Sequence, residues 1–168
     1  QVEEIISTGE NLQETAAPGA DSSGSKIKVM SYNIHSCIGI DGKHFLGRIA
    51  RIIRRQQPDI IALQEVDRNM ARTGNEDQAS LLGRILGMHH SYFAVLNSYD
   101  GEYGLAVLSR YPLKTSDFFY LPQRQQSFST EKRGVMRVTI EVPGGLLHIF
   151  NTHLSLFRRE RIVQMEYI

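Results

Sequence analysis

Polar side chains follow three apolar, strand-like segments of this sequence, and they are the residues best placed to carry chemistry. Asn33 ends KIKVMSYN, Glu65 follows IIALQ, and His153 ends IFNTH. Strand ends present side chains to the adjoining loops, where binding and catalytic residues concentrate. A carboxylate after a buried run must be paired or metal-bound, and a histidine can exchange a proton near neutral pH. Each also has a structural interpretation: a buried ion pair for Glu65, a hydrogen-bonded core residue for His153 and a turn cap for Asn33.

The first half of the sequence alternates between strand-like and helix-like segments. One segment places Leu46, Ile49 and Ile53 on a single face, with arginines on the other, which predicts an amphipathic helix. The nearly unbroken apolar run 59–66 is typical of a strand covered on both faces. The predicted elements are a strand over 26–33, a helix over 44–57, a strand over 59–66 and a helix over 76–86.

The second half is mostly strands and ends in a helix. Two hairpins are predicted from pairs of strand-like segments that flank turn residues. The predicted elements are strands over 91–96, 104–109, 114–120, 134–142 and 146–151, and a helix from 158 that the sequence leaves in mid-course. This order predicts an α/β protein with two-layer β structure and flanking helices.

Composition sets limits on the class of protein. The 168 residues are 41% hydrophobic and 22% charged, which is ordinary for one globular domain. No uncharged run approaches the 18 or so apolar residues that a membrane span requires. Cys37 is the single cysteine, so an internal disulfide framework and a cysteine-based zinc site are both excluded.

The charge is distributed unevenly along the chain. Five of the 18 acids and none of the 19 Lys and Arg lie in residues 1–25, so this segment carries −5 and residues 26–168 carry +6. We therefore interpret residues 1–25 as a flexible acidic linker or tail. Such a segment is common after a removed export signal, which favours an exported location over a cytoplasmic one, but an expression remnant would look similar.

Four motifs taken together have a specific order and spacing. KVMSYNI, IIALQEVD, EYGLAVLSR and FNTHLS resemble the endonuclease/exonuclease/phosphatase superfamily, most closely its bacterial members. The superfamily includes deoxyribonucleases, abasic-site endonucleases, inositol polyphosphate phosphatases and bacterial sphingomyelinases. The resemblance implies a deoxyribonuclease-like β-sandwich flanked by helices, of which residues 26–168 would be the N-terminal portion.

The resemblance also implies roles for individual residues. Glu65 matches the family's ligand for a divalent cation, normally Mg²⁺ and possibly Mn²⁺, and Asn33 matches the asparagine beside it. His153 matches the histidine that lies against the scissile phosphate. Glu102 matches a glutamate that pairs with this histidine and would keep it charged, and Arg133 a basic residue that meets a substrate phosphate. Together these groups would support metal-assisted hydrolysis of a phosphodiester.

The sequence departs from the family in its second half. The Asp-x-Asn motif and the late Ser-Asp-His triplet are absent, since no histidine follows His153 and no aspartate follows Asp117. We therefore expect about the first half of the fold, with one sheet of the sandwich, one wall of the site and a large exposed apolar face. A second half of the domain, or a second copy of the chain, would complete it.

Two functions from different classes follow from these observations. The first is a magnesium-dependent hydrolase of phosphate esters, whose substrate is left open between nucleic acid, a phospholipid head group and a small phosphorylated metabolite. The second is a non-catalytic half-domain that binds a partner chain and is inactive alone. The absence of the second-half motifs supports the second function, and the four matched motifs support the first.

Overall fold

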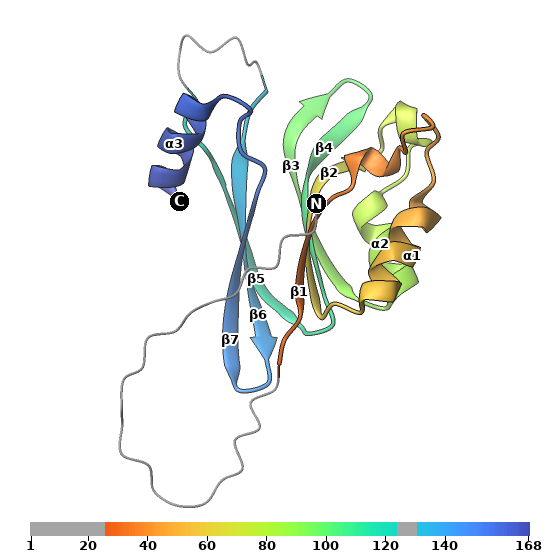
Figure 1. Cartoon of the computed structure of the whole chain (residues 1–168), viewed down its shortest axis with the longest axis vertical. Helices are drawn as coiled ribbons and strands as arrows, with labels where there is room; N and C mark the ends of the chain where they lie inside the picture. Colours follow the sequence, from red (N-terminus) through yellow and green to blue (C-terminus); the bar gives the residue numbers. More distant parts are fainter. Residues whose placement is uncertain (1–25, 124–130) are drawn as a thin grey trace, which may run out of the picture.

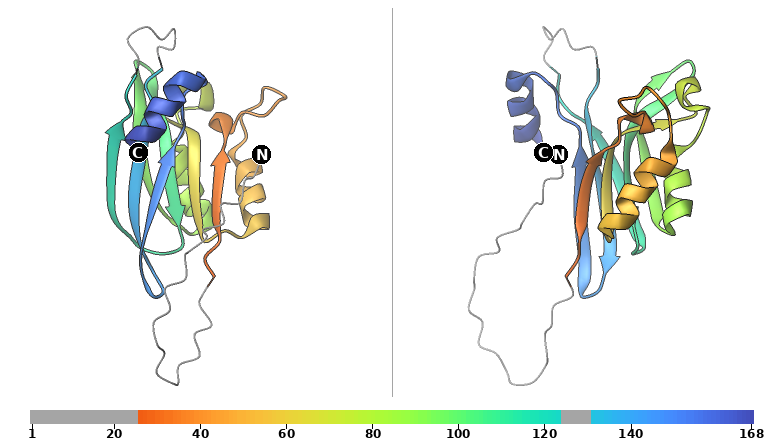
Figure 2. Two further views of the ribbon diagram at one scale, coloured as in Figure 1. Left: turned by 60° about the vertical axis from the view of Figure 1, so that its left-hand side comes forward. Right: turned by 45° about the vertical axis from the view of Figure 1, so that its right-hand side comes forward.

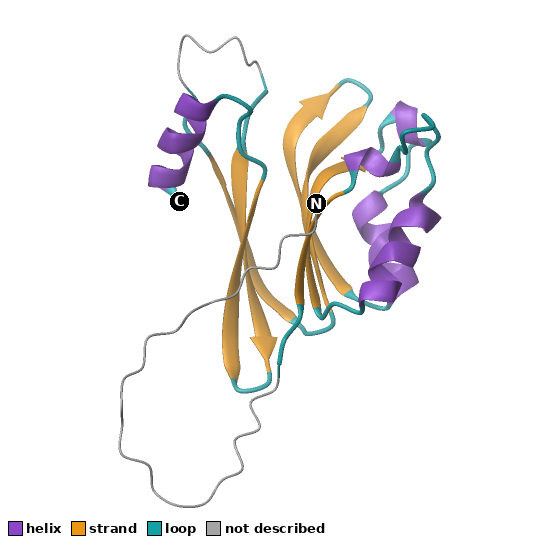
Figure 3. Cartoon of the chain, in the orientation of Figure 1, coloured by secondary structure: helices purple, strands orange, loops and turns teal. Residues whose placement is uncertain are grey.

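The computed structural model describes residues 26–123 and 131–168, and the predicted acidic segment at 1–25 lies outside these ranges. Within them, two β-sheets stand face to face with helices on their outer sides (Figures 1 and 3). The elements are β1 (Val29–Asn33), η1 (His35–Cys37), α1 (Leu46–Gln56), β2 (Ile60–Arg68), η2 (Ala71–Thr73), α2 (Gln78–Leu86), β3 (His89–Ser98), β4 (Gly101–Ser109), β5 (Leu113–Tyr120), β6 (Gly134–Val142), β7 (Gly145–Thr152) and α3 (Arg158–Tyr167). The predicted α/β sandwich is confirmed.

The first sheet has the strand order β1-β2-β4-β3. β1 and β2 are parallel, and the remaining pairs are antiparallel. β2 is buried along nearly its whole length because one of its faces meets the helices and the other meets the second sheet. The prediction of a strand covered on both faces is therefore confirmed.

Helices α1 and α2 cover the outer face of this sheet. The buried stripe of α1 includes Leu46, Ile49 and Ile53, which pack with Ile61 and Leu63 of β2. Helix α2 is capped at its start by Asp77, whose carboxylate accepts a hydrogen bond from the Ser80 N–H at 2.9 Å, and at its end by Gly87 in the left-handed conformation.

The expectation that this half of the fold contains only one sheet is wrong. β5, β6 and β7 form a second, antiparallel sheet, whose inner residues Met136, Val138 and Ile140 pack against Leu105 and Val107 of the first sheet. The inner face that was expected to be exposed is therefore buried in a core between the two sheets. This arrangement matters for the site, because each sheet contributes residues to it.

Helix α3 lies on the opposite side of the molecule from α1 and α2. Figure 2 shows it beside the face of β5–β7 that points away from the first sheet. Its buried residues are the polar Glu160 and Gln164, whereas Ile162 and Met165 are exposed. No helix among the described residues is long and apolar enough to span a membrane.

Candidate active site

Glu65 lies at a β-bulge in β2, and the bulge determines where its side chain points. The ladder with β4 pairs Gln64 with Leu105 and then Val66 with Gly104, which leaves Glu65 as the extra residue. Its φ of 57° lies in the left-handed region, which costs a non-glycine residue roughly 1–3 kcal/mol. Bulges of this kind re-aim a side chain and are frequent beside functional sites.

The two neighbouring strands, β4 and β3, also have special features at the level of this bulge. β3 has its own bulge between Ala94 and Leu96, and both bulges lie opposite Gly104. A Cβ atom at Gly104 would stand only 1.9 Å from the carbonyl oxygen of Phe93, so no other residue fits without a shift of the backbone. Both strands that pair with β4 therefore shift their register at the level of Glu65.

Asn33 fixes the orientation of the Glu65 carboxylate. Its side-chain Nδ2 donates a hydrogen bond to Glu65 Oε1 at 2.7 Å, and its Oδ1 accepts one from the backbone N–H of His35 at 3.0 Å. The parallel pairing of β1 and β2 brings the two residues together, since Asn33 pairs with Gln64. Because the His35 N–H holds the Asn33 amide oxygen, the amide nitrogen points to Glu65 and orients its carboxylate.

His153 reaches the same place from the second sheet because Asn151 anchors β7 to the first. Asn151 is buried, and its Nδ2 donates to the carbonyl oxygens of Leu63 at 2.8 Å and Ala106 at 3.0 Å. Its Oδ1 accepts from Gln64 Nε2 at 2.7 Å. These bonds hold the end of β7 beside β2, and His153 follows two residues later.

The His153 ring is close to Glu65 but is not hydrogen-bonded to it. Its Nδ1 lies 3.9 Å from Glu65 Oε1 and is buried without a hydrogen-bond partner. Burial, and then the Arg133 guanidinium, hold the pKa of His153 below its ordinary 6.5, although Glu65 and Glu131 act in the opposite direction. His153 is therefore a neutral imidazole at pH 7.

The predicted pairing of Glu102 with His153 is not found. Glu102 is the second residue of β4 and forms an ion pair with Arg68, directly opposite it in β2. The Arg68 guanidinium also lies 4.5 Å from the ring centre of Tyr92. Among the described carboxylates, Glu65 is the one within 4.0 Å of the His153 ring nitrogens. The expectation of a histidine kept charged by Glu102 is therefore corrected.

Arg133 does lie beside the predicted site. It is 6% exposed, its Nη2 is 3.0 Å from Glu131 Oε2, and its Nε is buried without a hydrogen-bond partner. Glu65, Tyr103, Arg133 and His153 line one small cavity together with Glu131. The structure thus brings together Asn33, Glu65, His153 and Arg133, and it adds Tyr103 and Glu131, which the sequence did not single out as site residues.

We expect His153 to titrate below pH 6.5 in the metal-free protein. Glu65→Gln should lower the midpoint further because the Glu65 carboxylate raises this pKa, whereas Glu102→Gln should leave it unchanged. Between the midpoint and 6.5 the unfolded chain binds more protons at His153 than the folded chain does, so the contribution of this residue to stability rises with pH there. NMR titration of the ring in the three proteins measures the midpoints, and a midpoint above 6.5 would contradict the assignment.

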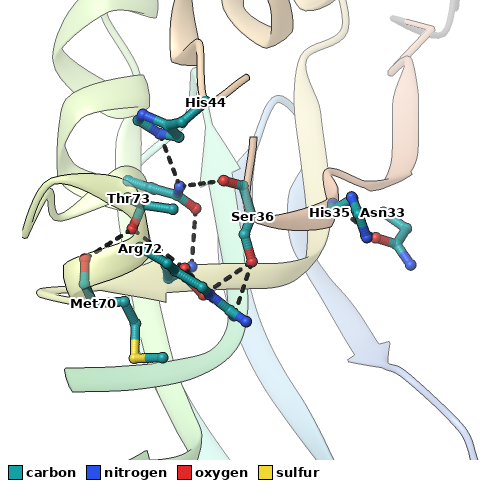
Figure 4. Close-up of polar contacts among 9 residues, drawn as sticks. Asn33, His35, Ser36, His44, Met70, Arg72 and Thr73 are labelled. Carbon is teal, nitrogen blue, oxygen red and sulfur yellow. Dashed lines mark hydrogen bonds and ion pairs between the residues drawn. The ribbon is translucent and has the colours of Figure 1, made fainter. Parts of the chain in front are cut away.

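A buried polar network holds the turn that follows Asn33 (Figure 4). Asp67 is fully buried, and its carboxylate accepts hydrogen bonds from Ser36 Oγ at 3.0 Å and from Arg72 Nε and Nη2 at 2.8 and 2.7 Å. Gln78 donates to the Ser36 carbonyl oxygen at 2.7 Å and accepts from the Asp67 N–H at 2.9 Å.

This turn requires such support because its backbone is strained. His35, Ser36 and Cys37 all have positive φ angles, between 48° and 59°, a conformation that L-residues adopt reluctantly. Cys37 is buried, and burial, with smaller effects of Glu76 and Asp67, raises the pKa of its thiol to about 12. It therefore stays protonated and has no nucleophilic character near neutral pH.

An open cavity of about 460 Å³ lies beside Glu65. Its walls come from the turn at η1, the loop at η2 and the hairpin of β3 and β4, and they include His35, Met70, Arg72, Leu96 and Tyr103. The Arg72 guanidinium carbon is 5.5 Å from the ring centre of Tyr103. This cavity and the small one at His153 share Glu65, Tyr103 and Glu131, so the two are adjacent.

The donor set at Glu65 is compatible with a hard cation. Mg²⁺ prefers oxygen ligands, keeps several waters and commonly uses only one or two carboxylates together with substrate phosphate oxygens. No group of three or more His, Cys, Asp or Glu residues that could hold a metal occurs in ranges 26–123 and 131–168. Glu65, oriented by Asn33, therefore fits a water-rich magnesium site and does not fit a transition-metal site made only of side chains.

The fold is a β-sandwich flanked by helices. Its first sheet supplies an oriented carboxylate, Glu65, and its second sheet leads to a histidine, His153, that faces this carboxylate. The chain belongs to the endonuclease/exonuclease/phosphatase family, which it matches over residues 30–162. The family is named for enzymes that cleave phosphate esters, and the fold predicted from the resemblance is the one found.

Individual proteins are similar to the chain over part of their length. The chain is 27% identical over 150 residues to the uncharacterized protein YbhP of Escherichia coli (strain K12), spanning 57% of that protein. Similar solved structures include an endonuclease/exonuclease/phosphatase of Beutenbergia cavernae, at a TM-score of 0.67 and 26% identity, and a family protein of Leptotrichia buccalis, at 0.66 and 22%. Each alignment covers 84% of this chain, and 44% and 60% of those chains. The chain thus spans about half the length of its relatives.

Proposed function

We propose that the chain carries the metal-binding half of a phosphoesterase that hydrolyses phosphodiesters with Mg²⁺ or Mn²⁺. The observation that carries the proposal is the strained bulge at Glu65, whose carboxylate accepts a hydrogen bond from Asn33 at 2.7 Å and lies 3.9 Å from His153. Strain at one carboxylate, with two polar partners converging on it from separate strands, is typical of a functional site. Membership of the family points to the same chemistry.

The residues of this chain have separable roles in such a reaction. Asn33 holds the Glu65 carboxylate in the position that binds the cation, and a bound Mg²⁺ would offset the charge on the phosphate oxygens. His153, neutral at pH 7, can accept a proton or donate a hydrogen bond to a phosphate oxygen. Arg133 adds positive charge at the same cavity, partly offset by Glu131.

We further propose that a complementary segment completes the enzyme, either a second half of the domain or a second copy of this chain. A phosphodiesterase needs a group that activates the attacking water. The described residues around Glu65 supply a second carboxylate, Glu131, that is paired with Arg133, and one neutral histidine, which can act as an acid or as a base but not as both at once.

Hydrolysis of bis-p-nitrophenyl phosphate by the native gene product tests this proposal. We expect turnover that requires Mg²⁺ or Mn²⁺, is abolished by chelation and returns when the ion is added back. The 168-residue chain, measured as a verified monomer, should show no turnover, because groups that act as a unit lose nearly all their effect when some are missing. If the native gene product also shows no turnover, while the chain still binds a partner chain, the non-catalytic half-domain is the correct function.

A further inference from the structure

Gln78 is a fully buried polar residue at the start of α2, and it does not line either of the two cavities at Glu65. Its side-chain amide is hydrogen-bonded at both ends. Nε2 donates to the Ser36 carbonyl oxygen at 2.7 Å, and Oε1 accepts from the Asp67 backbone N–H at 2.9 Å. These partners fix the orientation of the amide, because only its nitrogen can donate and only its oxygen can accept.

The two groups that Gln78 joins follow the two residues of the candidate metal site. Ser36 comes three residues after Asn33, and Asp67 comes two residues after Glu65. The backbone hydrogen bonds between β1 and β2 end at residue 34. Beyond that point, among the described residues, Gln78 is the side chain that bonds to the backbone of both segments. It therefore sets the separation of the two segments just outside the sheet.

The turn after β1 determines how the Asn33 side chain is oriented. Asn33 Oδ1 accepts from the His35 N–H at 3.0 Å, and its Nδ2 then faces Glu65 Oε1 at 2.7 Å. His35 directly precedes Ser36, whose carbonyl oxygen is the group that Gln78 holds (Figure 4). A shift of Ser36 would therefore move the His35 N–H away and leave the Asn33 amide free to rotate.

We infer that Gln78 is a positioning residue, which holds the turn after Asn33 so that the Asn33 amide orients the Glu65 carboxylate. Glutamine suits this role because it offers a donor and an acceptor and adds no charge beside the buried Asp67 carboxylate, which is already paired with Arg72. The inference rests on the proposed function, since the orientation of Glu65 matters for the reaction only if Glu65 binds a cation.

Gln78→Met tests the inference, because methionine fills a similar space and removes both hydrogen bonds. The side-chain NMR signal of Asn33 in the 168-residue chain reports the bond to Glu65 without any metal, and Asn33→Ser identifies this signal. We expect the bonded amide proton of Asn33 to move to the position of an exposed asparagine in Gln78→Met. Mn²⁺ affinity, followed by electron paramagnetic resonance, should fall about tenfold, the lower end of the effect of groups that support a metal ligand.

Two further variants separate positioning from a general loss of stability. Val138→Ala removes buried methyl groups from the core between the sheets, so it should lower stability and leave the Asn33 signal and Mn²⁺ affinity unchanged. Gln78→Glu should be rescued at pH 5, where the native protein is the reference because His44 and Glu76 also lie beside this residue. Burial next to Asp67 raises the pKa of the introduced carboxyl, and a protonated carboxyl can donate and accept as glutamine does.

The results that would overturn the inference differ from those that would overturn the proposed function. An unchanged Asn33 signal and unchanged Mn²⁺ affinity in folded Gln78→Met would overturn the inference, and so would a Gln78→Glu signal at pH 5 as displaced as that of Gln78→Met. If the proposed function is wrong, the native chain will not bind Mn²⁺, but the Asn33 signal will still move in Gln78→Met.

Discussion

Glu65→Gln is expected to lower metal-dependent phosphodiester hydrolysis by the native gene product by about 100-fold or more. The substitution keeps the shape of the side chain and removes the charge that holds the cation, which generally has an effect of this size. The amide can still bond with Asn33, so the bulge should persist. Initial rates with bis-p-nitrophenyl phosphate at saturating Mg²⁺ measure the loss, and Mn²⁺ binding followed by electron paramagnetic resonance should show weaker affinity in the 168-residue chain.

Glu102→Gln is the matched control for this result. It makes the same chemical change at another glutamate of the first sheet, but Glu102 pairs with Arg68 and is not near His153. Activity and Mn²⁺ affinity should therefore stay within about twofold of the unaltered protein, as expected for the loss of a partly exposed ion pair. Normal turnover in Glu65→Gln would show that Glu65 is a structural acid and would remove the metal assignment.

The order of helices and strands could be predicted from the sequence because the relevant signals are local. The apolar stripe of α1 and the long apolar run of β2 repeat at the spacing of a helix and a buried strand. The division of strands between two sheets is not a local property. Met136, Val138 and Ile140 alternate as they would in a strand of any sheet, and only long-range packing against β2 and β4 shows which face they cover.

The candidate site shows the same distinction between local and long-range information. Asn33, Glu65 and His153 are recognisable because each is polar and follows an apolar strand, and the structure brings them together. The pairing of Glu102 with His153 was implied only by the resemblance, and β4 begins at Gly101, earlier than the strand predicted over 104–109. Only Tyr99 and Asp100 separate β3 from β4, so Glu102 lies within a strand opposite Arg68.

Residues whose importance depends on a fold-specific contact were not identifiable. Asp67 is one charged residue among several in the segment after LQE, and nothing in its neighbours shows that it is completely buried. Its burial follows from the position of α2 and the turn at η1, which bring Gln78 and Ser36 to it. Tyr103 likewise lines the site only because of long-range pairing. The bulges in β2 and β3 determine which residues of those strands lie opposite it.

Arg72→Met is expected to lower the free energy of unfolding by about 2–3 kcal/mol. The substitution leaves the Asp67 carboxylate fully buried with the Ser36 and Thr73 hydroxyls as side-chain donors but no cation. Removing one partner of a fully buried pair typically costs about 3–5 kcal/mol, and the partial exposure of Arg72 reduces this value. Urea denaturation of the 168-residue chain measures the change.

Two further variants determine whether the uncompensated charge is the cause. Arg68→Met removes a guanidinium from a partly exposed pair and should cost at most about 1 kcal/mol. Adding Asp67→Asn to Arg72→Met removes the buried charge and should recover part of the loss, because replacing both partners of a buried pair is far less damaging than removing one. If the double variant is less stable than Arg72→Met, the loss comes from packing of the arginine stem, and the network holds the turn at His35–Cys37 by shape alone. If stability is recovered, the loss in Arg72→Met comes from the uncompensated charge of the buried Asp67 carboxylate, which Arg72 normally offsets.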